Sequence, residues 1–350
     1  MYPHFNIDKC VNCGLCNKVC PAINLSDTLN TPLILFASYA KNELVRKISS
    51  SGGIFYNIAK YIISIGGKVY AVTLENLKCK HIRIEKVSEI NKCIGSKYIQ
   101  SNAKKIYNSI KLDLKENVPV LFVGTPCQCR ALNNIVGKKE NLYIVDFICH
   151  GVCSQELFDR SIKLYEKQNN CKVIDFSFRY KTNETLRNYK LKYLDKDGII
   201  CSEIKSPIDF PYYNAFLNHY SFRNCCYTCN FKTINRVSDI TLGDFWGIEK
   251  IDKNINDEKL GYSAMLLNTS KGTVIFSEIK SQLVVKEIPI EYLIENNYAL
   301  TNKDNRPLIS FFFEILFKLD IKLLSDLFLT SNPSLIGRVF RWLCNKVDLK

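Results

Sequence analysis

The stretch VPVLFVGTPCQCRALNNIVGKKENLYIVDFIC, Val118–Cys149, contains the pattern that decides the fold class. Its two apolar runs, VPVLFVG and NLYIVDFIC, have the length and residue types of buried strands. The segment TPCQCRALNNIVG between them is typical of a turn followed by a helix. Because short buried strands that alternate with helices characterise α/β proteins, the sequence predicts an α/β core here.

The same alternation precedes this stretch and extends the predicted core over residues 35–155. LILFASYA is an apolar run typical of a short strand. SSSGGIFYNIAKYIISIGGKVYAVTL predicts a Ser/Gly turn, a helix and a strand. Farther along, apolar and polar residues alternate with period two in residues 173–204, on both sides of a Lys-Asp-Gly turn. This pattern predicts an antiparallel hairpin. Residues 307–347 predict a helical tail.

The composition is that of a globular protein, because 47% of the 350 residues are hydrophobic and 23% are charged. The N-terminus MYPHFNIDK lacks the apolar core of a signal peptide, and no apolar run reaches the ~18–20 residues of a membrane helix. We therefore expect a cytoplasmic protein without a transmembrane segment. The net charge of +14 comes from scattered lysines, which disfavours nucleic-acid binding and suits an acidic partner or an anionic ligand.

The segment KCVNCGLCNKVCPAI, Lys9–Ile23, predicts an iron–sulfur site at the start of the chain. Its spacing C-x2-C-x2-C-x3-C-P is that of a loop around a 4Fe-4S cluster, with Cys10, Cys13, Cys16 and Cys20 as candidate ligands. A zinc site or four free thiols fit this spacing less well. In two-cluster ferredoxins the fourth cysteine binds the other cluster. Either Cys20 completes its own cluster here, or a distant cysteine does.

A second group of cysteines is dispersed along the chain, which has 16 cysteines in all. Two pairs directly follow predicted strands, and loops at the carboxyl ends of strands converge in α/β sheets. Together with a later C-x2-C pair they could form one four-thiolate site, or several could be small apolar core residues. The dispersed cysteines are Cys127, Cys129, Cys149, Cys153, Cys225, Cys226 and Cys229; isolated ones, expected in the core, are Cys79, Cys93, Cys171, Cys201 and Cys344.

Two turns, SSSGG and GTP, could bind an anion such as the phosphate of a dinucleotide or flavin, because each precedes a predicted helix. An ordinary helix cap gives the same residues, and neither turn fits G-x-G-x-x-G or the P-loop pattern. His150 could donate a proton near a flavin or be an ordinary turn histidine. Lys97 and Tyr98 could hold a phosphate or a pyrimidine edge, or lie in a solvated loop.

Six motifs in order resemble one family, that of coenzyme F420 hydrogenase/dehydrogenase beta subunits. They are SSSGGIF, GSKYIQS, VLFVGTPCQCRAL, VDFICHGVCS, CCYTCNFK and RVSDITLGDFWGI, and the resemblance runs from about Lys9 to about Ser310. It implies an iron–sulfur flavoprotein that binds FAD and passes electrons between clusters, the flavin and a soluble substrate. Relatives use coenzyme F420, or receive electrons from ferredoxin.

Carried over to this sequence, the resemblance implies Cys127, Cys149, Cys226 and Cys229 as ligands of a second 4Fe-4S cluster. Cys129, Cys153 and Cys225 depart from the family pattern beside these positions, so the ligands could shift by one residue. The head resembles the second half of a two-motif ferredoxin domain, whose first half is missing. The residues implied to bind the flavin or close its site are Ser51, Gly52, Gly53, Gly95, Ser96, Lys97, Tyr98, Gln100, Gly124, Thr125, Asp239, Gly243, Asp244 and Trp246.

The sequence thus predicts an α/β (α+β) protein with three parts. Residues 1–32 form a small ferredoxin-like 4Fe-4S head, residues 33–306 a mixed α/β flavin-binding core, and residues 307–350 a helical tail. The predicted function is an oxidoreductase that relays electrons between two 4Fe-4S clusters and FAD, with His150 and Lys97 as catalytic candidates. The alternatives are a coenzyme F420-linked beta subunit of a larger enzyme and a non-catalytic electron-transfer subunit. Ferredoxin or another redox protein is the expected partner, and a homo-oligomer is left open.

Overall fold

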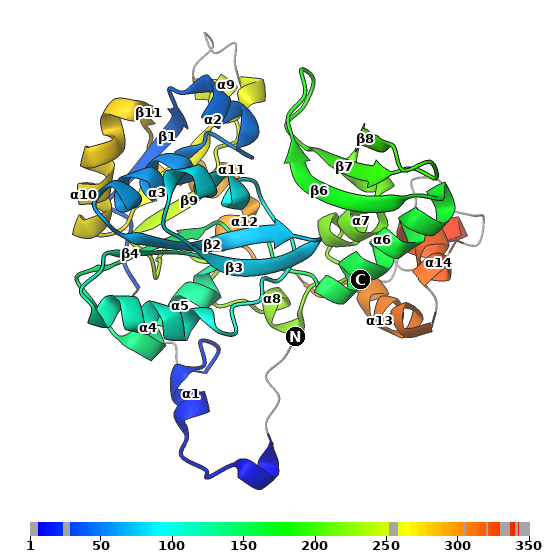
Figure 1. Cartoon of the computed structure of the whole chain (residues 1–350), viewed down its shortest axis with the longest axis horizontal. Coiled ribbons are helices and arrows are strands. Elements are labelled where there is room, and N and C mark those ends of the chain that lie inside the picture. Colours follow the sequence, from blue (N-terminus) through cyan, green and yellow to red (C-terminus); the bar gives the residue numbers. More distant parts are fainter. Residues whose placement is uncertain are drawn as a thin grey trace.

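Two β-sheets organise the chain, as the computed structural model of residues 6–23, 29–251, 258–303, 305–319, 321–329, 337–339 and 342 shows (Figure 1). The larger is an eight-stranded mixed sheet with the order β11-β1-β10-β9-β5-β4-β2-β3, and the smaller is the antiparallel sheet β6-β7-β8. The protein is therefore a mixed α/β protein, as the sequence predicts. The proposed domain boundaries stay a prediction.

Four parallel strands form the centre of the large sheet. They are β2 (Lys68–Glu75), β4 (Val120–Val123), β5 (Leu142–Phe147) and β9 (Ile240–Asp244). In register, Val123 lies beside Val145, and Phe147 lies beside Leu242. Since these strands run the same way, the loops that follow β4, β5 and β9 leave the sheet at one edge.

Antiparallel strands flank this centre on both sides. β3 (Lys78–Ile84) pairs with β2, while β10 (Ser263–Leu267), β1 (Ile34–Ala40) and β11 (Leu283–Glu287) extend the sheet beyond β9. The first predicted strand, residues 33–40, thus lies between two strands from the last third of the chain. The local pattern of residues 35–155 alone does not indicate this long-range pairing.

Helices cover both faces of the large sheet (Figure 1). α3 (Ile54–Ser64) and α10 (Ser270–Ile279) pack on one face, where Ile58 and Ile62 of α3 are fully buried. α4 (Ile106–Lys115) and α5 (Pro126–Val136) cover the opposite face. The apolar residues of α3 recur three or four positions apart, so one stripe of the helix faces the sheet.

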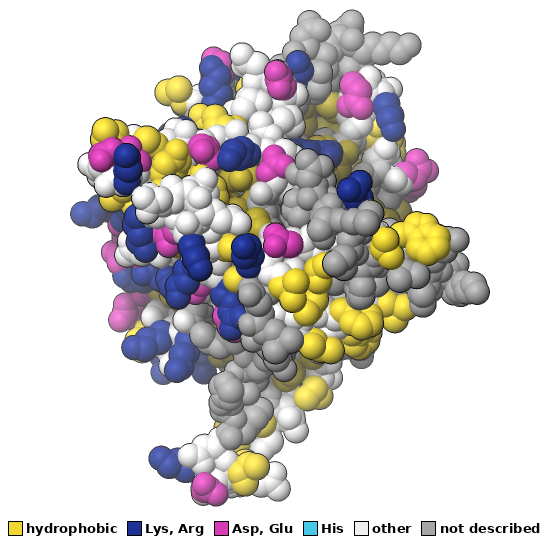
Figure 2. Space-filling view, turned by 90° about the vertical axis from the view of Figure 1, so that its right-hand side faces the viewer, with side chains coloured by type: hydrophobic (Ala, Val, Ile, Leu, Met, Phe, Trp, Pro, Cys, Tyr) yellow, Lys and Arg dark blue, Asp and Glu magenta, His cyan; other side chains and the backbone are white. Residues whose placement is uncertain are grey.

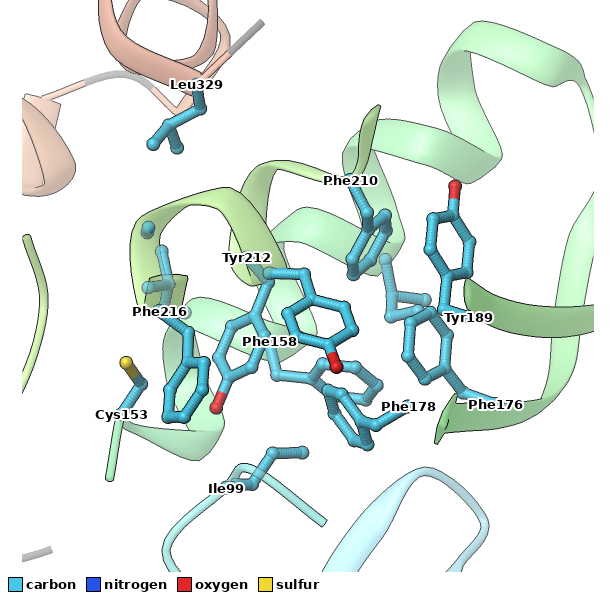
Figure 3. Packing of buried hydrophobic residues seen from close by; sticks show 14 of the residues in the cluster. Ile99, Cys153, Phe158, Phe176, Phe178, Tyr189, Phe210, Tyr212, Phe216 and Leu329 are labelled. Carbon is cyan, nitrogen blue, oxygen red and sulfur yellow. The ribbon is translucent and has the colours of Figure 1, made fainter. Parts of the chain in front are cut away.

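The small sheet has three strands where the sequence predicts a two-stranded hairpin. β6 (Lys172–Tyr180), β7 (Asn188–Leu194) and β8 (Ile200–Lys205) pack on α6 (Gln155–Asn169) and α7 (Pro211–Leu217). Rings from these elements fill the space between them, with Phe176 stacked on Tyr189 at 5.3 Å between centroids (Figure 3). Burial of these large rings is the main apolar contribution to this layer.

The described part of the predicted helical tail packs against α6 and α7. Its helices are α13 (Ile309–Leu319), α14 (Ile321–Leu324) and the π-helical turn η6 (Ser325–Leu329). Ile309, Phe313 and other tail residues are buried in the aromatic core, whereas Leu308, Phe311, Phe312 and Ile315 are exposed. Figure 2 views the side on which these helices lie and shows hydrophobic side chains gathered toward its lower right. Beyond residue 329 the structure describes only residues 337–339 and 342, so Cys344 lies outside the described residues.

The shorter elements complete the fold. They are η1 (Ile7–Lys9), α1 (Leu15–Val19), α2 (Glu43–Ile48), η2 (Val87–Cys93), η3 (Pro207–Asp209), α8 (Asn224–Tyr227), α9 (Ile248–Ile251), η4 (Glu258–Leu260), η5 (Lys280–Gln282), α11 (Ile290–Asn296) and α12 (Tyr298–Thr301). Among the described residues, no helix is both long and apolar enough to cross a membrane.

A buried histidine makes the stability of the large sheet dependent on pH. His81 on β3 stacks on Phe122, and burial lowers its pKa to about 4. The unfolded chain binds a proton at this site below about pH 6.5, so folding is favoured above that pH and loses this contribution as the pH falls toward 4. The loss amounts to about 3 kcal/mol.

We expect the difference in unfolding free energy between wild type and His81→Phe to change by this amount between pH 7 and pH 4. Denaturant titrations of both proteins across this range measure it, and titrations common to both proteins cancel in the difference. Parallel stability curves for the two proteins would contradict the assignment.

Candidate functional site

Candidate site residues gather at the edge of the large sheet where β4, β5 and β9 end. They form two sets. We call Cys127, Cys149, Cys225, Cys226 and Cys229 the cysteine group. We call residues 49–53 and 95–100, the two loops implied to bind a flavin, the loop pair.

Cys127 is presented by the first turn of α5. The backbone N–H of Thr125 donates to Gln128 Oε1 at 3.2 Å, and the Thr125 hydroxyl lies 3.2 Å from the Cys127 sulfur. Pro126 occupies the first helical position, where its missing N–H costs nothing. The turn that includes Gly124 and Thr125 therefore caps α5 and orients Cys127, while its assignment to the flavin stays a prediction.

The cysteine group comes from three separate segments. Cys127 lies in the first turn of α5 and Cys149 follows β5, whereas the last three residues of the group lie in or just after α8. Burial, together with the nearby thiols of Cys127 and Cys229, raises the pKa of Cys149 to about 12. Partial desolvation likewise raises the pKa of Cys127, although its side chain reaches solvent. The loops after β4 and β5 thus lie near the later C-x2-C pair.

Cys225 and Cys226 interact directly with one another. Their thiol–thiol hydrogen bond lowers the pKa of Cys225 to about 6 and raises that of Cys226. Cys225 is exposed and Cys226 is partly buried. Cys226 lies near Cys149 and Cys225 lies near Cys127, and the choice between them as a ligand stays a prediction.

Two other cysteines, which the sequence places next to the candidate ligands, are part of the core. Cys129 is fully buried and donates to the Gly124 carbonyl at 3.5 Å. Cys153 is fully buried with its sulfur 2.9 Å from the Ser221 hydroxyl. Among the isolated cysteines, Cys79 and Cys93 are buried as expected, whereas Cys171 and Cys201 are only partly buried.

The donor set of the cysteine group fits an iron–sulfur cluster. Within the described ranges, no three Cys, His, Asp or Glu side chains converge as the ligands of a single ion do. A cubane cluster differs, because each of its thiolates binds a different iron and the sulfurs need not meet at one point. Arg223, close to Cys127 and Cys225, adds positive charge that favours thiolates.

The Ser/Gly loop is fixed by close backbone contacts. Ser50 Oγ accepts a hydrogen bond from the Ser96 N–H at 2.7 Å, which joins the two loops of the pair. A side chain on Gly52 would strike the Ser38 carbonyl and come within 2.9 Å of the Ser263 nitrogen. Gly53, with φ +86°, starts α3 without a side-chain cap. The first turn of this helix can therefore attract an anion.

Lys97 combines partial exposure with a desolvated ammonium group. Its Nζ donates to the carbonyls of Cys93 at 2.8 Å and Ile94 at 2.9 Å. Burial lowers its pKa to about 8. Near this lysine, Gln100 Oε1 is buried and has no hydrogen-bond partner in the part of the chain that the structure describes. A polar ligand between the loops would satisfy such an atom, so these residues fit a flavin.

Basic residues that the sequence analysis did not single out hold the small sheet against the loop pair. Arg179 on β6 donates to Asp244 at 2.9 Å and to the Ser50 carbonyl at 3.2 Å. Lys181 Nζ donates to the Ser51 carbonyl at 2.7 Å. Irregular pairing of β6 between Ser177 and Tyr180 breaks the alternation of the strand. The period-two pattern therefore could not show that Arg179 points inward.

Asp244 and Trp246, both predicted to close the site, lie beside a cavity of about 200 Å³. Asp244 is the partner of Arg179, and the Arg187 guanidinium lies 4.5 Å from the Trp246 ring. By contrast, Asp239 lies at the base of β9, where it accepts a hydrogen bond from the Ile144 N–H and supports the sheet. Gly243 lies on β9, where a side chain would strike Ile148.

His150 lies between the cysteine group and the loop pair. Its Nε2 is paired with Nε2 of His219, and its ring is 5.7 Å from Phe216. Phe216 in turn stacks on Tyr98 at 4.6 Å. A series of ring contacts therefore connects Tyr98 with the residue next to Cys149, and the proposed role of His150 as an acid stays a prediction.

The head lies against the far end of α5 (Figure 1). Cys10, Cys13 and Cys16 are exposed, Cys20 is partly buried, and Gly14 with φ +69° starts α1. Asn134 donates to the Val19 carbonyl at 3.5 Å. Along α5, Asn134 and Cys127 are about 10 Å apart at ~1.5 Å per residue. Ligation by the head cysteines stays a prediction.

Comparison with known proteins identifies a family. Residues 119–292 match the family formed by the C terminus of the beta subunit of coenzyme F420 hydrogenase/dehydrogenase. The fold is similar to that of a chain in the F420-reducing [NiFe] hydrogenase complex from Methanosarcina barkeri, solved with xenon derivatization. The TM-score is 0.50 and the sequence identity 15%, over 85% of this chain and 96% of that chain. None of the curated proteins compared with this sequence matches it significantly.

Gly52→Ala tests how tightly the Ser/Gly loop is packed. The added methyl group meets backbone atoms of Ser38 and Ser263, which cannot rotate away. We expect a loss of about 2–3 kcal/mol in unfolding free energy. Gly66→Ala is the control, since Gly66 has φ +79° but open space around it and should lose only about 1 kcal/mol. Equal losses in denaturant titrations of the two variants would disprove the close contact.

Proposed function

Residues 119–292 belong to the C-terminal family of coenzyme F420 hydrogenase/dehydrogenase beta subunits, and from this membership we propose that the protein is an iron–sulfur flavoprotein oxidoreductase. The observation that supports this proposal most directly is that the thiols of Cys127, Cys149 and Cys229, which come from three segments, lie near one another. Thiols gathered in this way suit a metal cluster, and the anion-attracting start of α3 suits a flavin.

In this proposal Cys127, Cys149, Cys226 and Cys229 hold one 4Fe-4S cluster, and Cys10, Cys13, Cys16 and Cys20 hold another. Clusters would supply one-electron transfer and FAD would supply the conversion to hydride transfer. The capping of α5 by Thr125 and Gln128 fixes the direction of Cys127.

The loop pair would bind the FAD. The first turn of α3, which Gly53 starts, favours a phosphate through its N–H groups. Gln100 Oε1 can accept a hydrogen bond from the cofactor, and Tyr98 offers an aromatic ring fixed by Phe216. The links from Arg179 and Lys181 to the Ser/Gly loop hold this side of the site in place.

Lys97 and His150 are the proposed proton-handling residues. Because the pKa of Lys97 is lowered to about 8, its Nζ can hold or release a proton near neutral pH. His150 is held by His219 at its Nε2, so its orientation is defined. Both side chains are partly exposed, which leaves them accessible to a substrate.

A second candidate function is that of a coenzyme F420-linked beta subunit in a larger enzyme. The similar M. barkeri chain belongs to an F420-reducing [NiFe] hydrogenase complex. The exposed head with Cys10, Cys13 and Cys16 would then face a partner subunit that supplies or removes electrons. An electron-transfer subunit without chemistry of its own is the third alternative. For each, a cytoplasmic location and a redox-protein partner such as ferredoxin remain our expectation.

Iron and flavin content test the proposal. Protein purified anaerobically should contain about eight irons, an equal amount of sulfide and about one FAD per chain. Cys226→Ser should lose about four irons and keep the head cluster. The matched control is Cys153→Ser, which replaces a buried core thiol and should keep all the iron.

The outcomes of this assay separate the alternatives. Loss of iron in Cys225→Ser and not in Cys226→Ser would move the ligand to Cys225. No loss in any variant of the cysteine group would refute the second cluster. Absence of flavin from the wild-type protein would refute the oxidoreductase proposal.

An activity comparison distinguishes the two enzymatic hypotheses. Reduced coenzyme F420 or reduced ferredoxin is mixed anaerobically with the FAD-loaded protein, and bleaching of the flavin absorbance is followed. A ferredoxin-linked enzyme should bleach at least tenfold faster with ferredoxin, and an F420-linked subunit should show the reverse, about 1.4 kcal/mol or more in barrier either way. Lys97→Met should slow only a flavin reduction in which Lys97 transfers a proton. Bleaching of the flavin by neither donor would indicate another partner.

A further inference from the structure

Arg236 has a role that its place in the motif RVSDITLGDFWGI does not explain. Its side chain is only 2% exposed, and its guanidinium is surrounded by acceptors from several segments. Nη1 donates to the carbonyls of Phe231 at 3.3 Å and Thr233 at 3.0 Å. Nη2 donates to Asp146 Oδ2 at 3.1 Å and to the Phe147 carbonyl at 3.2 Å.

These acceptors lie next to the cysteine group in sequence. Phe147 precedes Cys149 by two residues, and Phe231 follows Cys229 by two residues. One side chain therefore connects the backbone just before Cys149 to the backbone just after Cys229. Both connections use carbonyl groups, whose positions follow the main chain that carries the thiols.

The backbone of Arg236 connects a third segment, the one that leads out of the head. The Arg236 N–H donates to the Asn30 carbonyl at 2.8 Å, and the Asn30 N–H donates to the Arg236 carbonyl at 2.7 Å. The main chain of Arg236 therefore fixes the chain at Asn30, where it leaves the head. The side chain of Arg236 fixes the segments that carry the cysteine group.

Only a guanidinium can make this set of contacts. Arginine has donors on three nitrogens in a plane, whereas lysine has three donors on a single nitrogen. Here Nη1 and Nη2 point to opposite segments, and Nε donates to Thr241 Oγ1 at 3.2 Å. The Asp146 carboxylate, fully buried, balances the charge, so the pair does not leave an isolated ion in the interior.

We infer that Arg236 is a positioning residue for the cysteine group: it holds the Cys149 and Cys229 segments at the separation that one cluster needs. This inference rests on the proposed function only in the identity of the cluster. The spacing of the two thiols is a property of the chain itself.

The test uses the full chain with Arg236→Lys, purified anaerobically beside wild type. The control is Arg46→Lys, which alters an equally buried guanidinium that donates to the Gly261 carbonyl. Both variants lose stability, but only Arg236→Lys should lose about four of about eight irons, with the head cluster's electron paramagnetic resonance signal unchanged. Equal iron in Arg236→Lys and wild type would overturn the inference.

A second measurement does not depend on iron. Dibromobimane, which bridges two nearby thiols, is added to the metal-free protein, and cross-linked peptides are identified by mass spectrometry. Wild type and Arg46→Lys should give the Cys149–Cys229 link, and Arg236→Lys should give several-fold less. Equal yields in all three proteins would overturn the inference.

The two measurements also separate failure of the inference from failure of the proposed function. If wild type contains only the head cluster, the proposed second cluster is wrong, and the cross-linking result alone decides the role of Arg236. Should Arg236→Lys not fold, the double variant Asp146→Asn/Arg236→Gln removes both charges together. It should fold and still show the reduced cross-link yield, and a wild-type yield from it would overturn the inference.

Discussion

The parallel pairing of β4 with β5 and of β5 with β9 is the constraint on which the candidate site depends. Parallel strands all end at the same edge, so the residues that follow them meet without any special local sequence. Cys127 follows β4, Cys149 follows β5, and Asp244 ends β9. The flanking antiparallel strands add width and burial to the sheet but contribute few candidate site residues.

Buried cations connect what the sheet brings together. Arg179 and Arg236, which are buried, and Lys181, which is partly buried, each donate to a backbone carbonyl of a segment far away in the sequence. Burying a charge costs free energy, which is offset only when the donors find acceptors of good geometry. Such contacts are directional, unlike apolar packing, so they fix loop positions that the apolar clusters leave open. Arg179 and Lys181 act on the loop pair, and Arg236 acts on the cysteine group.

The sequence predicts the elements of the core well, because apolar residues in the segment 118–149 recur at strand and helix spacing. This spacing reflects only which side of each segment is buried, so it can be read without knowing the partner strands. It does not predict that β1 lies between β10 and β11, since that pairing depends on strands more than 200 residues away. It also misses the inward direction of Arg179, which an irregularity in β6 produces. In one respect more could have been predicted. Cys127 and Cys129 are two positions apart on a helix and so face nearly opposite directions, which leaves only one of them for the site.

The head differs from the rest of the protein because its described helices have no buried residues to stabilise them. Neither η1 nor α1 buries a single residue, and the described contacts of the head with the core include those of Asn134 with Val19 and of Asn30 with Arg236. A segment of this size without a core needs a cross-link to keep one conformation. Cys10, Cys13, Cys16 and Cys20 would provide one if they bind the predicted cluster, since metal binding then supplies folding free energy. The spacing that first indicates a cluster and the absence of buried residues in these two elements therefore support the same interpretation.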